Sequence, residues 1–164
     1  MSTHAPQAAS VQIAKGVRIA VIAARFNAFI VDELLNGCQR RLAELGAEAN
    51  CIETFRVPGA FELPAAAKAA AQSRRFAAVI CLGCVIRGDT PHFDFVAGEA
   101  ARGIQAVAIA EALPVIFGVL TTNTEEQARA RAGGSHSHAG RNAADTAAEM
   151  ISVMASIAYP PKSR

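Results

Sequence analysis

The sequence predicts an α/β protein with three layers, in which helices cover both faces of a four-stranded parallel sheet of the flavodoxin-like kind. Short apolar runs rich in β-branched residues alternate with stretches whose apolar residues recur every three to four positions, as strands and helices alternate in such folds. The longest run, AVICLGCVI at 78–86, is too short to cross a membrane and is typical of a strand buried on both faces.

Each predicted strand precedes a predicted helix. The second strand is the least apolar, which places it near an edge of the sheet. The expected strands are residues 17–23, 48–57, 78–86 and 114–120. The expected helices are residues 30–45, 61–73, 90–110 and 142–158, with a brief helix that starts at the 122–125 motif and ends near residue 131.

Capping residues mark the start of two helices. Thr90 and Pro91 suit the N-cap and the first helical position, where no backbone N–H is needed. Thr122-Asn123-Thr124-Glu125 reads as a capping box for the short helix that ends near Arg131.

Length and composition predict one domain with extensive subunit contacts. The chain has 164 residues, so we expect a single domain over 1–164, with 1–14 as an arm that is flexible or binds a neighbour and 159–164 as a tail. Hydrophobic residues make up 52% and charged residues 18%, which is more apolar surface than a monomer of this size easily hides.

Composition also excludes several classes of function. A net charge of +2, no Trp and one Tyr argue against binding to nucleic acid or to a membrane surface. No secretory or transmembrane signal is visible, and the four cysteines lie within predicted helices or strands, so we expect a cytoplasmic protein with reduced thiols.

Cys81 and Cys84 form a C-x-x-C within a strand, where their spacing points them to opposite faces, which disfavours a redox pair. A zinc site lacks a second ligand pair, and we expect no metal.

Unusual residues collect in the loops that follow the strands, at 25–27, 58–62, 88–92 and 121–123. The carboxyl ends of parallel strands share one edge of the sheet, which is where open α/β sheets bind ligands. His92 would lie in the first turn of a helix at this edge. The free N–H groups of that turn attract anions, and Gly88 allows close approach of the backbone. The corner therefore suits proton transfer on a phosphorylated small molecule.

Each candidate residue also has a purely structural interpretation. His92 could be an ordinary surface residue of a helix, and Phe26 could fold its ring onto the core. Glu62 could do no more than complement a helix dipole, and Arg131 could be a solvated cation at a helix end. His136 and His138 lie in a Gly/Ser turn, where we expect exposed side chains rather than ligands.

Motifs in these loops resemble the lumazine synthase family, which catalyses the penultimate step of riboflavin biosynthesis. The resemblance covers residues 17–158. The motifs are RFN at 25–27, VPGAFELP at 57–64, GCVIRGDTPHFDFV at 83–96, FGVLTT at 117–122 and RAG at 131–133. The resemblance implies a transferase that condenses 5-amino-6-(D-ribitylamino)uracil with 3,4-dihydroxy-2-butanone 4-phosphate. The products would be 6,7-dimethyl-8-ribityllumazine, phosphate and water, with no metal or organic cofactor.

The resemblance also implies roles for individual residues. Phe26 would stack on the pyrimidine ring. The ribityl chain would be contacted by Ala60, Phe61 and Glu62, and the pyrimidine edge would be met, largely through backbone, by Cys84, Val85 and Ile86.

The phosphate half of the site follows from the same resemblance. Asp89 and Thr90 would hold the butanone phosphate at the helix start, and Arg131 would be its cationic partner. Phe117 would lie beside the ring from across a subunit boundary, and His92 would carry the proton. Asp89 places a carboxylate beside that phosphate, which requires contact through backbone N–H groups.

The family forms pentamers with sites between neighbouring subunits. Some pentamers close into sixty-subunit shells, in some cases around riboflavin synthase. One motif departs from the family pattern: an Asn-Lys-Gly-x-Glu stretch is replaced by residues 138–142, so its Lys is absent at Ala139. Whether Arg141 or His138 supplies that charge is left open.

Two other functions fit these residues less well. A relative that binds flavin or lumazine, or only forms shells, would keep Phe26 but lose His92 or Arg131, and both are present. A flavodoxin-like electron carrier needs a phosphate loop after the first strand, and Arg25-Phe26-Asn27-Ala28 has no such Gly/Ser/Thr cluster.

Overall fold

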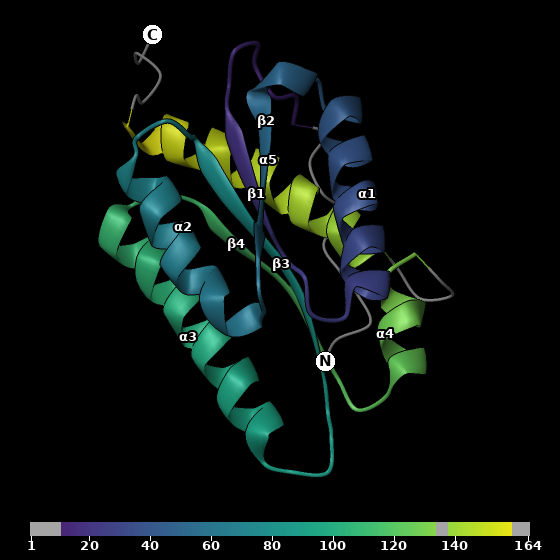
Figure 1. The fold of residues 1–164 in the computed structure, drawn as a ribbon. Coiled ribbons are helices and arrows are strands. Elements are labelled where there is room, and N and C mark those ends of the chain that lie inside the picture. The colour runs from purple at the N-terminus through teal and green to yellow at the C-terminus, as the bar shows by residue number, and fades with distance from the viewer. Residues whose placement is uncertain (1–10, 134–137, 159–164) are drawn as a thin grey trace, which may run out of the picture.

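A four-stranded parallel sheet with strand order β2-β1-β3-β4 forms the centre of the molecule. The computed structural model describes residues 11–133 and 138–158 (Figure 1). The strands are β1 (Ile19–Ala24), β2 (Ile52–Val57), β3 (Ala78–Ile86) and β4 (Val115–Thr122). The predicted fold class is confirmed, and β2 lies at an edge, as its lower apolar content predicted.

Helices cover both faces of the sheet (Figure 1). One face carries α2 (Leu63–Gln72) and α3 (His92–Glu111), and the other carries α1 (Ala28–Glu44) and α5 (Ala139–Ala158), with α4 (Glu125–Arg131) beside α1. Short 3₁₀ turns, η1 (Ala49–Cys51) and η2 (Ala60–Glu62), flank β2. In the described ranges, none of the helices combines the length and the apolar character that crossing a bilayer requires.

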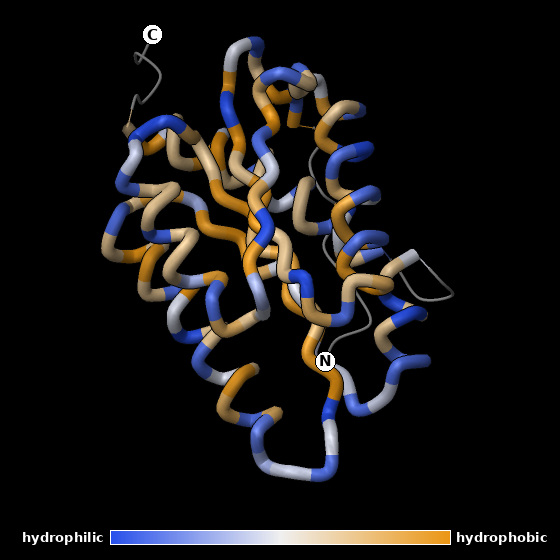
Figure 2. Tube along the Cα trace, viewed as in Figure 1, coloured by the Kyte–Doolittle hydropathy of each residue, from blue (hydrophilic) through white to orange (hydrophobic). Residues whose placement is uncertain are grey.

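The two faces of the sheet build two separate cores, because alternate residues of each strand point to opposite sides. Figure 2 shows the apolar strands at the centre and polar residues on the outer sides of the helices. Cys84 packs with the core beneath α1 and α5, whereas Cys81 packs with the core beneath α2 and α3. The expectation that this C-x-x-C divides between the two faces is therefore confirmed, and all four cysteines are buried free thiols.

Both predicted helix caps are wrong in detail. Pro91, rather than Thr90, occupies the N-cap position of α3, with φ −62° and ψ −4°, and no side chain caps the turn. The N-cap of α4 is Thr124, whose hydroxyl accepts from the Gln127 N–H at 3.3 Å. Thr122 instead ends β4, where its buried hydroxyl donates to the carbonyl of Thr124 at 2.9 Å. Continued pairing with β3 holds Thr122 in the strand.

Helices α1 and α5 approach each other at two glycines. A Cβ on Gly140 would lie 2.0 Å from the carbonyl oxygen of Leu34, and one on Gly37 would lie 2.0 Å from the His138 ring. His138 is therefore half-buried against α1, contrary to the expected exposed side chain, and α5 begins at Ala139 rather than near Asn142. His136, most of the predicted arm and the tail lie outside the described residues.

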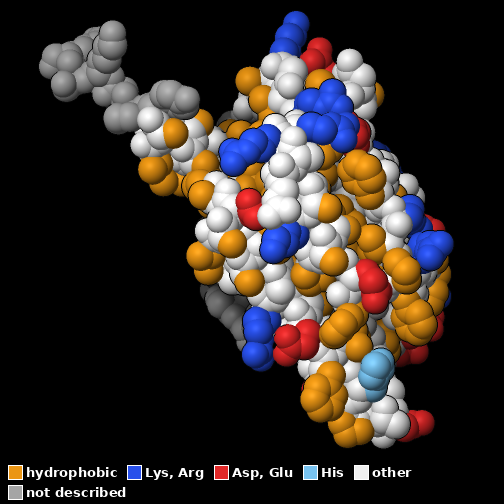
Figure 3. Space-filling view, turned by 60° about the vertical axis from the view of Figure 1, so that its left-hand side comes forward, with side chains coloured by type: hydrophobic (Ala, Val, Ile, Leu, Met, Phe, Trp, Pro, Cys, Tyr) orange, Lys and Arg blue, Asp and Glu red, His pale blue; other side chains and the backbone are white. Residues whose placement is uncertain are grey.

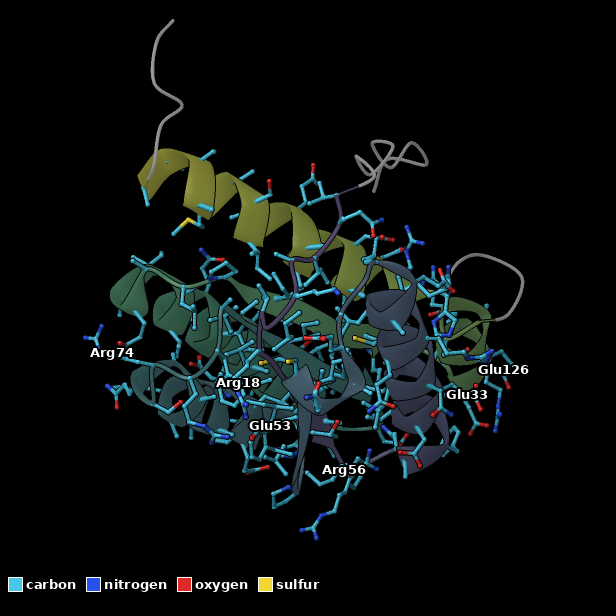
Figure 4. The ribbon with its side chains drawn as sticks, turned by 90° about the horizontal axis from the view of Figure 1, so that it is seen from above. Arg18, Glu33, Glu53, Arg56, Arg74 and Glu126 are labelled. Carbon is cyan, nitrogen blue, oxygen red and sulfur yellow. The ribbon has the colours of Figure 1, made fainter. Side chains whose placement is uncertain are left out.

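Charged side chains at the amino ends of the strands pair with one another. The carboxylate of Glu53 accepts from Arg18, which lies beside it in Figure 4. It also accepts from Arg75 at 2.5 Å. These hydrogen bonds lower the pKa of the Glu53 carboxyl, Arg75 contributing the larger effect. The guanidinium of Arg75 also lies 4.9 Å from the centroid of the Phe76 ring. Ion pairs therefore occupy this edge, and the opposite edge holds the candidate site.

Candidate active site

A cavity of about 560 Å³ lies at the carboxyl edge of the sheet. It is formed by the loops after β1 and β2, the end of β3 and the first turns of α3. The predicted site residues that line it are Phe26, Ala60, Phe61, Glu62, Cys84, Val85, Ile86, Thr90 and His92. The structure thus brings together side chains that lie far apart in the sequence, as the shared strand edge predicted.

Backbone hydrogen bonds hold the first two loops side by side. The N–H of Arg25 donates to the carbonyl of Val57 at 2.8 Å, and that of Phe26 donates to the carbonyl of Pro58 at 3.0 Å. Phe26 is 70% exposed. Its ring is therefore not folded onto the core, and the exposed face is available for stacking.

Asn27 fixes the direction in which Phe26 leaves the strand. It adopts the left-handed conformation, with φ 56° and ψ 44°, which asparagine tolerates better than most residues. Its side-chain Nδ2 donates to the carbonyl of Cys84 at 3.0 Å. Asn27 therefore ties the loop after β1 to the end of β3.

Glu62 closes a turn and also lines the cavity. One carboxylate oxygen, Oε2, accepts from the backbone N–H of Gly59 at 2.8 Å, which closes the turn after β2. The half-buried side chain also lines the cavity. A carboxylate held in this way can accept hydrogen bonds from the hydroxyls of a polyol.

The first turn of α3 closes the other side of the cavity. Thr90 and His92 line it and are exposed to solvent, and no side chain caps the turn. The backbone N–H groups of the first turn of α3 are therefore free to bind an anion. Asp89 is exposed and is not among the lining residues, although its neighbour Gly88 is.

Two predicted site residues lie elsewhere. Phe117, which is 44% exposed, and Arg131 line a second hollow of about 730 Å³ between α3, β4 and α5. The lining of the first cavity, as far as the chain is described, contains no Lys or Arg. A single subunit therefore does not bring the expected phosphate cation to the histidine.

Neither residue considered as a substitute for the absent Lys faces the second hollow. Arg141 donates to the carboxylate of Glu44 on α1 at 2.8 and 2.7 Å, and together with Arg41 it lowers the pKa of Glu44 to about 2. His138 packs on Gly37, and its burial lowers its pKa. Ala139 itself lines the hollow beside Arg131. Position 139 thus lines the second hollow, but its alanine carries no charge.

Comparison with known proteins identifies the family of this chain. A family model described as 6,7-dimethyl-8-ribityllumazine synthase matches residues 16–155. The chain belongs to this family. A 6,7-dimethyl-8-ribityllumazine synthase of Syntrophus aciditrophicus (strain SB) is 50% identical over 145 residues, covering 88% of this chain and 94% of the relative. The protein of the same name from Coxiella burnetii (strain CbuG_Q212) is 48% identical over 140 residues, covering 85% and 93%.

Besides Gly88, whose backbone role the sequence indicated, five cavity residues had no predicted role: Asn27, Gly59, Phe93, Phe95 and Val96. Asn27 stands inside the RFN motif, and its position directly after a strand was the available signal. Phe95 is 68% exposed, which the helical spacing of the sequence did not reveal. Across the parts of the chain that the structure describes, no three His, Cys or acidic side chains gather as a metal site would require.

Cys84 lines the cavity, but its thiol is buried in the core beneath α1 and α5, and we expect it to react slowly. Burial raises its pKa to about 11, so only about one thiol in a thousand is ionised at pH 8. We expect iodoacetamide to modify Cys84 about a hundredfold more slowly than it modifies free cysteine at the same pH. Peptide mapping by mass spectrometry measures that rate. Modification of Cys84 as fast as free cysteine would contradict a buried, protonated thiol.

Proposed function

We propose that this chain condenses 5-amino-6-(D-ribitylamino)uracil with 3,4-dihydroxy-2-butanone 4-phosphate to give 6,7-dimethyl-8-ribityllumazine, phosphate and water. The observation that supports this most strongly is that three groups line the same cavity. They are the exposed ring of Phe26, the carboxylate of Glu62 and the imidazole of His92 at the uncapped start of α3. Each of these groups suits one part of the two substrates.

The pyrimidine substrate fits the side of the cavity formed by β1, β2 and β3. The exposed ring of Phe26 would stack on the uracil, and the backbone of Cys84, Val85 and Ile86 would meet its polar edge. The carbonyl of Cys84 already accepts a hydrogen bond from Asn27. We therefore expect the other backbone groups of this segment to form hydrogen bonds with the uracil edge. The ribityl hydroxyls would donate to Glu62, beside Ala60 and Phe61.

The phosphate substrate fits the start of α3. The free N–H groups around Gly88 and Thr90 would bind the phosphate, with Asp89 contributing its backbone only. Phe117 and Arg131 share the second hollow, so in our proposal both residues reach the cavity of a neighbouring subunit. The site would then be completed only in a ring, which we expect to be a pentamer.

The surface supports such an assembly. Large apolar side chains remain exposed on several elements; they include Phe26, Phe61, Phe95, Ile109, Phe117 and Ile157. Figure 3 shows hydrophobic side chains spread over one face of the molecule down to its lower tip. Burial of these side chains between subunits removes apolar surface from water. Light scattering after size-exclusion chromatography distinguishes a pentamer from a sixty-subunit shell.

The reaction requires few catalytic groups from the protein. The uracil amine attacks the ketone and loses water to form an imine, proton removal then expels phosphate, and the second amine closes the ring with loss of water. His92 would accept and return protons during these steps. Because the amine and the ketone are already reactive, holding them together should supply much of the acceleration. The buried free cysteines support our placement of the reaction in the cytoplasm.

We expect Arg131→Ala to raise the KM for the butanone phosphate at least about tenfold and to leave the KM for the pyrimidine within about twofold. The reason is that a charged hydrogen bond to phosphate is lost, and only one substrate carries that anion. Steady-state kinetics with each substrate varied in turn measures both constants. Arg129→Ala on the same helix is the control, because Arg129 pairs with Glu125. Equal effects on both substrates would show that Arg131 is structural.

A further inference from the structure

A guanidinium outside the cavity anchors the first turn of α3. Arg87 directly follows β3, and its Nη2 and Nη1 donate to the two carboxylate oxygens of Asp94 at 2.9 and 3.3 Å. Its Nε donates to Oδ1 of Asn123 at 3.2 Å. The guanidinium carbon also lies 4.1 Å from the centroid of the Phe93 ring. Each of its three nitrogens and one of its faces are therefore engaged.

The partners of Arg87 belong to two separate parts of the fold. Phe93 and Asp94 are in the first turn of α3, next to His92, whereas Asn123 lies in the loop between β4 and α4. The backbone N–H of Arg87 donates to the carbonyl of Thr122 at 2.9 Å, so the arginine itself is fixed to the end of the sheet. Arg87 thus links a helix start to a rigid strand edge.

The first turn of α3 needs such an anchor. Figure 1 shows this end of the helix extending past the sheet and past the neighbouring α2. No side chain caps it, and Pro91 at the N-cap position offers no N–H. Arg87 lowers the pKa of the Asp94 carboxyl, so the pair stays charged near neutral pH. Its side chain is not among those lining the cavity, which separates it from the groups that would touch substrate.

We infer that Arg87 is a positioning residue, which holds His92 and the free N–H groups of α3 where the reaction needs them. The inference rests on the proposed function for its kinetic consequences. The side chains of the pair are 42% and 59% exposed, and exposed ion pairs contribute little to global stability. Loss of Arg87 should therefore change the geometry of the site more than the stability of the fold.

The kinetic test compares Arg87→Ala with Arg129→Ala. Arg129 is a matched control, because it donates to Glu125 at 2.8 Å and lies 4.9 Å from the Phe29 ring centroid, yet makes no bond to α3. We expect Arg87→Ala to lower kcat about tenfold and to raise the KM for the butanone phosphate, because small displacements of reacting groups are costly. The KM for the pyrimidine, which is bound by other loops, should stay within about twofold of its original value.

A conservative variant separates geometry from charge. Arg87→Lys should recover little of the loss, because one ammonium group cannot form a fork to Asp94 and also reach Asn123. Full recovery by lysine would overturn the inference, since the charge alone would then suffice. If Arg87→Ala fails to assemble, Asp94→Asn takes its place in the same comparison.

Hydrogen exchange tests the inference without turnover. In the assembled protein, we expect amides of residues 92–96 to exchange about fivefold faster in Arg87→Ala than in Arg129→Ala. Unchanged exchange and kinetics in Arg87→Ala would overturn the positioning role, as would faster exchange throughout the chain. If the unaltered protein lacked synthase activity, the proposed function would fail, while the exchange result would still decide whether Arg87 anchors the turn.

Discussion

His92→Ala should lower kcat about a hundredfold while the protein still folds, assembles and binds its product. General acid–base catalysis by one residue is typically worth about 10²–10⁴-fold, and we expect the lower end because positioning supplies much of the acceleration. The side chain is exposed at the start of α3, so its removal leaves no buried void. Steady-state kinetics with both substrates measures the loss.

Two further measurements make this result specific to the imidazole. The midpoint of thermal unfolding should stay within about 2 °C, because surface substitutions change stability little. Product affinity from calorimetry should stay within about threefold, because the ring and ribityl contacts come from the loops after β1 and β2. Full activity in a folded, assembled His92→Ala protein would remove His92 from the mechanism.

The strand edges were the most predictable part of the molecule. The apolar run at 78–86 is β3 over its whole length, because a strand buried on both faces must be apolar throughout. Once four parallel strands are placed, their carboxyl ends must share an edge. That geometry, together with the residues of the loops, places Phe26, Glu62 and His92 in one region, and the structure puts them around one cavity.

Helix starts were harder to predict, because several adjacent residues could serve as caps. Thr90 and Thr122 are both good N-cap residues by type, yet neither occupies that position. The pairing of β4 with β3 retains Thr122 in the strand. At α3 the N-cap position falls on Pro91, one residue after Thr90. His138 illustrates the same limit, since the close approach of α1 and α5 at Gly37 buries a histidine whose local sequence suggests a loop.

The placement of Phe117 and Arg131 in a second hollow could not be derived from residue patterns. Arg131 ends α4, which follows the same sheet edge as His92, whereas Phe117 lies within β4. The family resemblance, and not the residue pattern, indicated that Phe117 acts across a subunit boundary. Both residues lie in the hollow lined by α3, β4 and α5. The second hollow uses the outer side of β4, which is an edge strand and therefore open to a neighbour.

Mixing two inactive variants should restore part of the activity. The first variant, Phe26→Ala with His92→Ala, damages the first cavity and leaves the second hollow intact. The second, Phe117→Ala with Arg131→Ala, does the reverse. In rings formed by joint refolding, a boundary that joins an intact cavity to an intact hollow would contain a complete site. Random mixing in equal amounts should complete about one site in four.

The same experiment tests whether Arg131 and Phe117 act on their own subunit. If they did, each chain of either variant would contain an incomplete site, and mixing would restore nothing. A variant with all four substitutions, mixed with the first variant, is the control, since no boundary in those rings joins two intact halves. Native mass spectrometry verifies that both chains share rings. Recovery near one quarter of the original activity would support a shared site, whereas no recovery in verified mixed rings would contradict it.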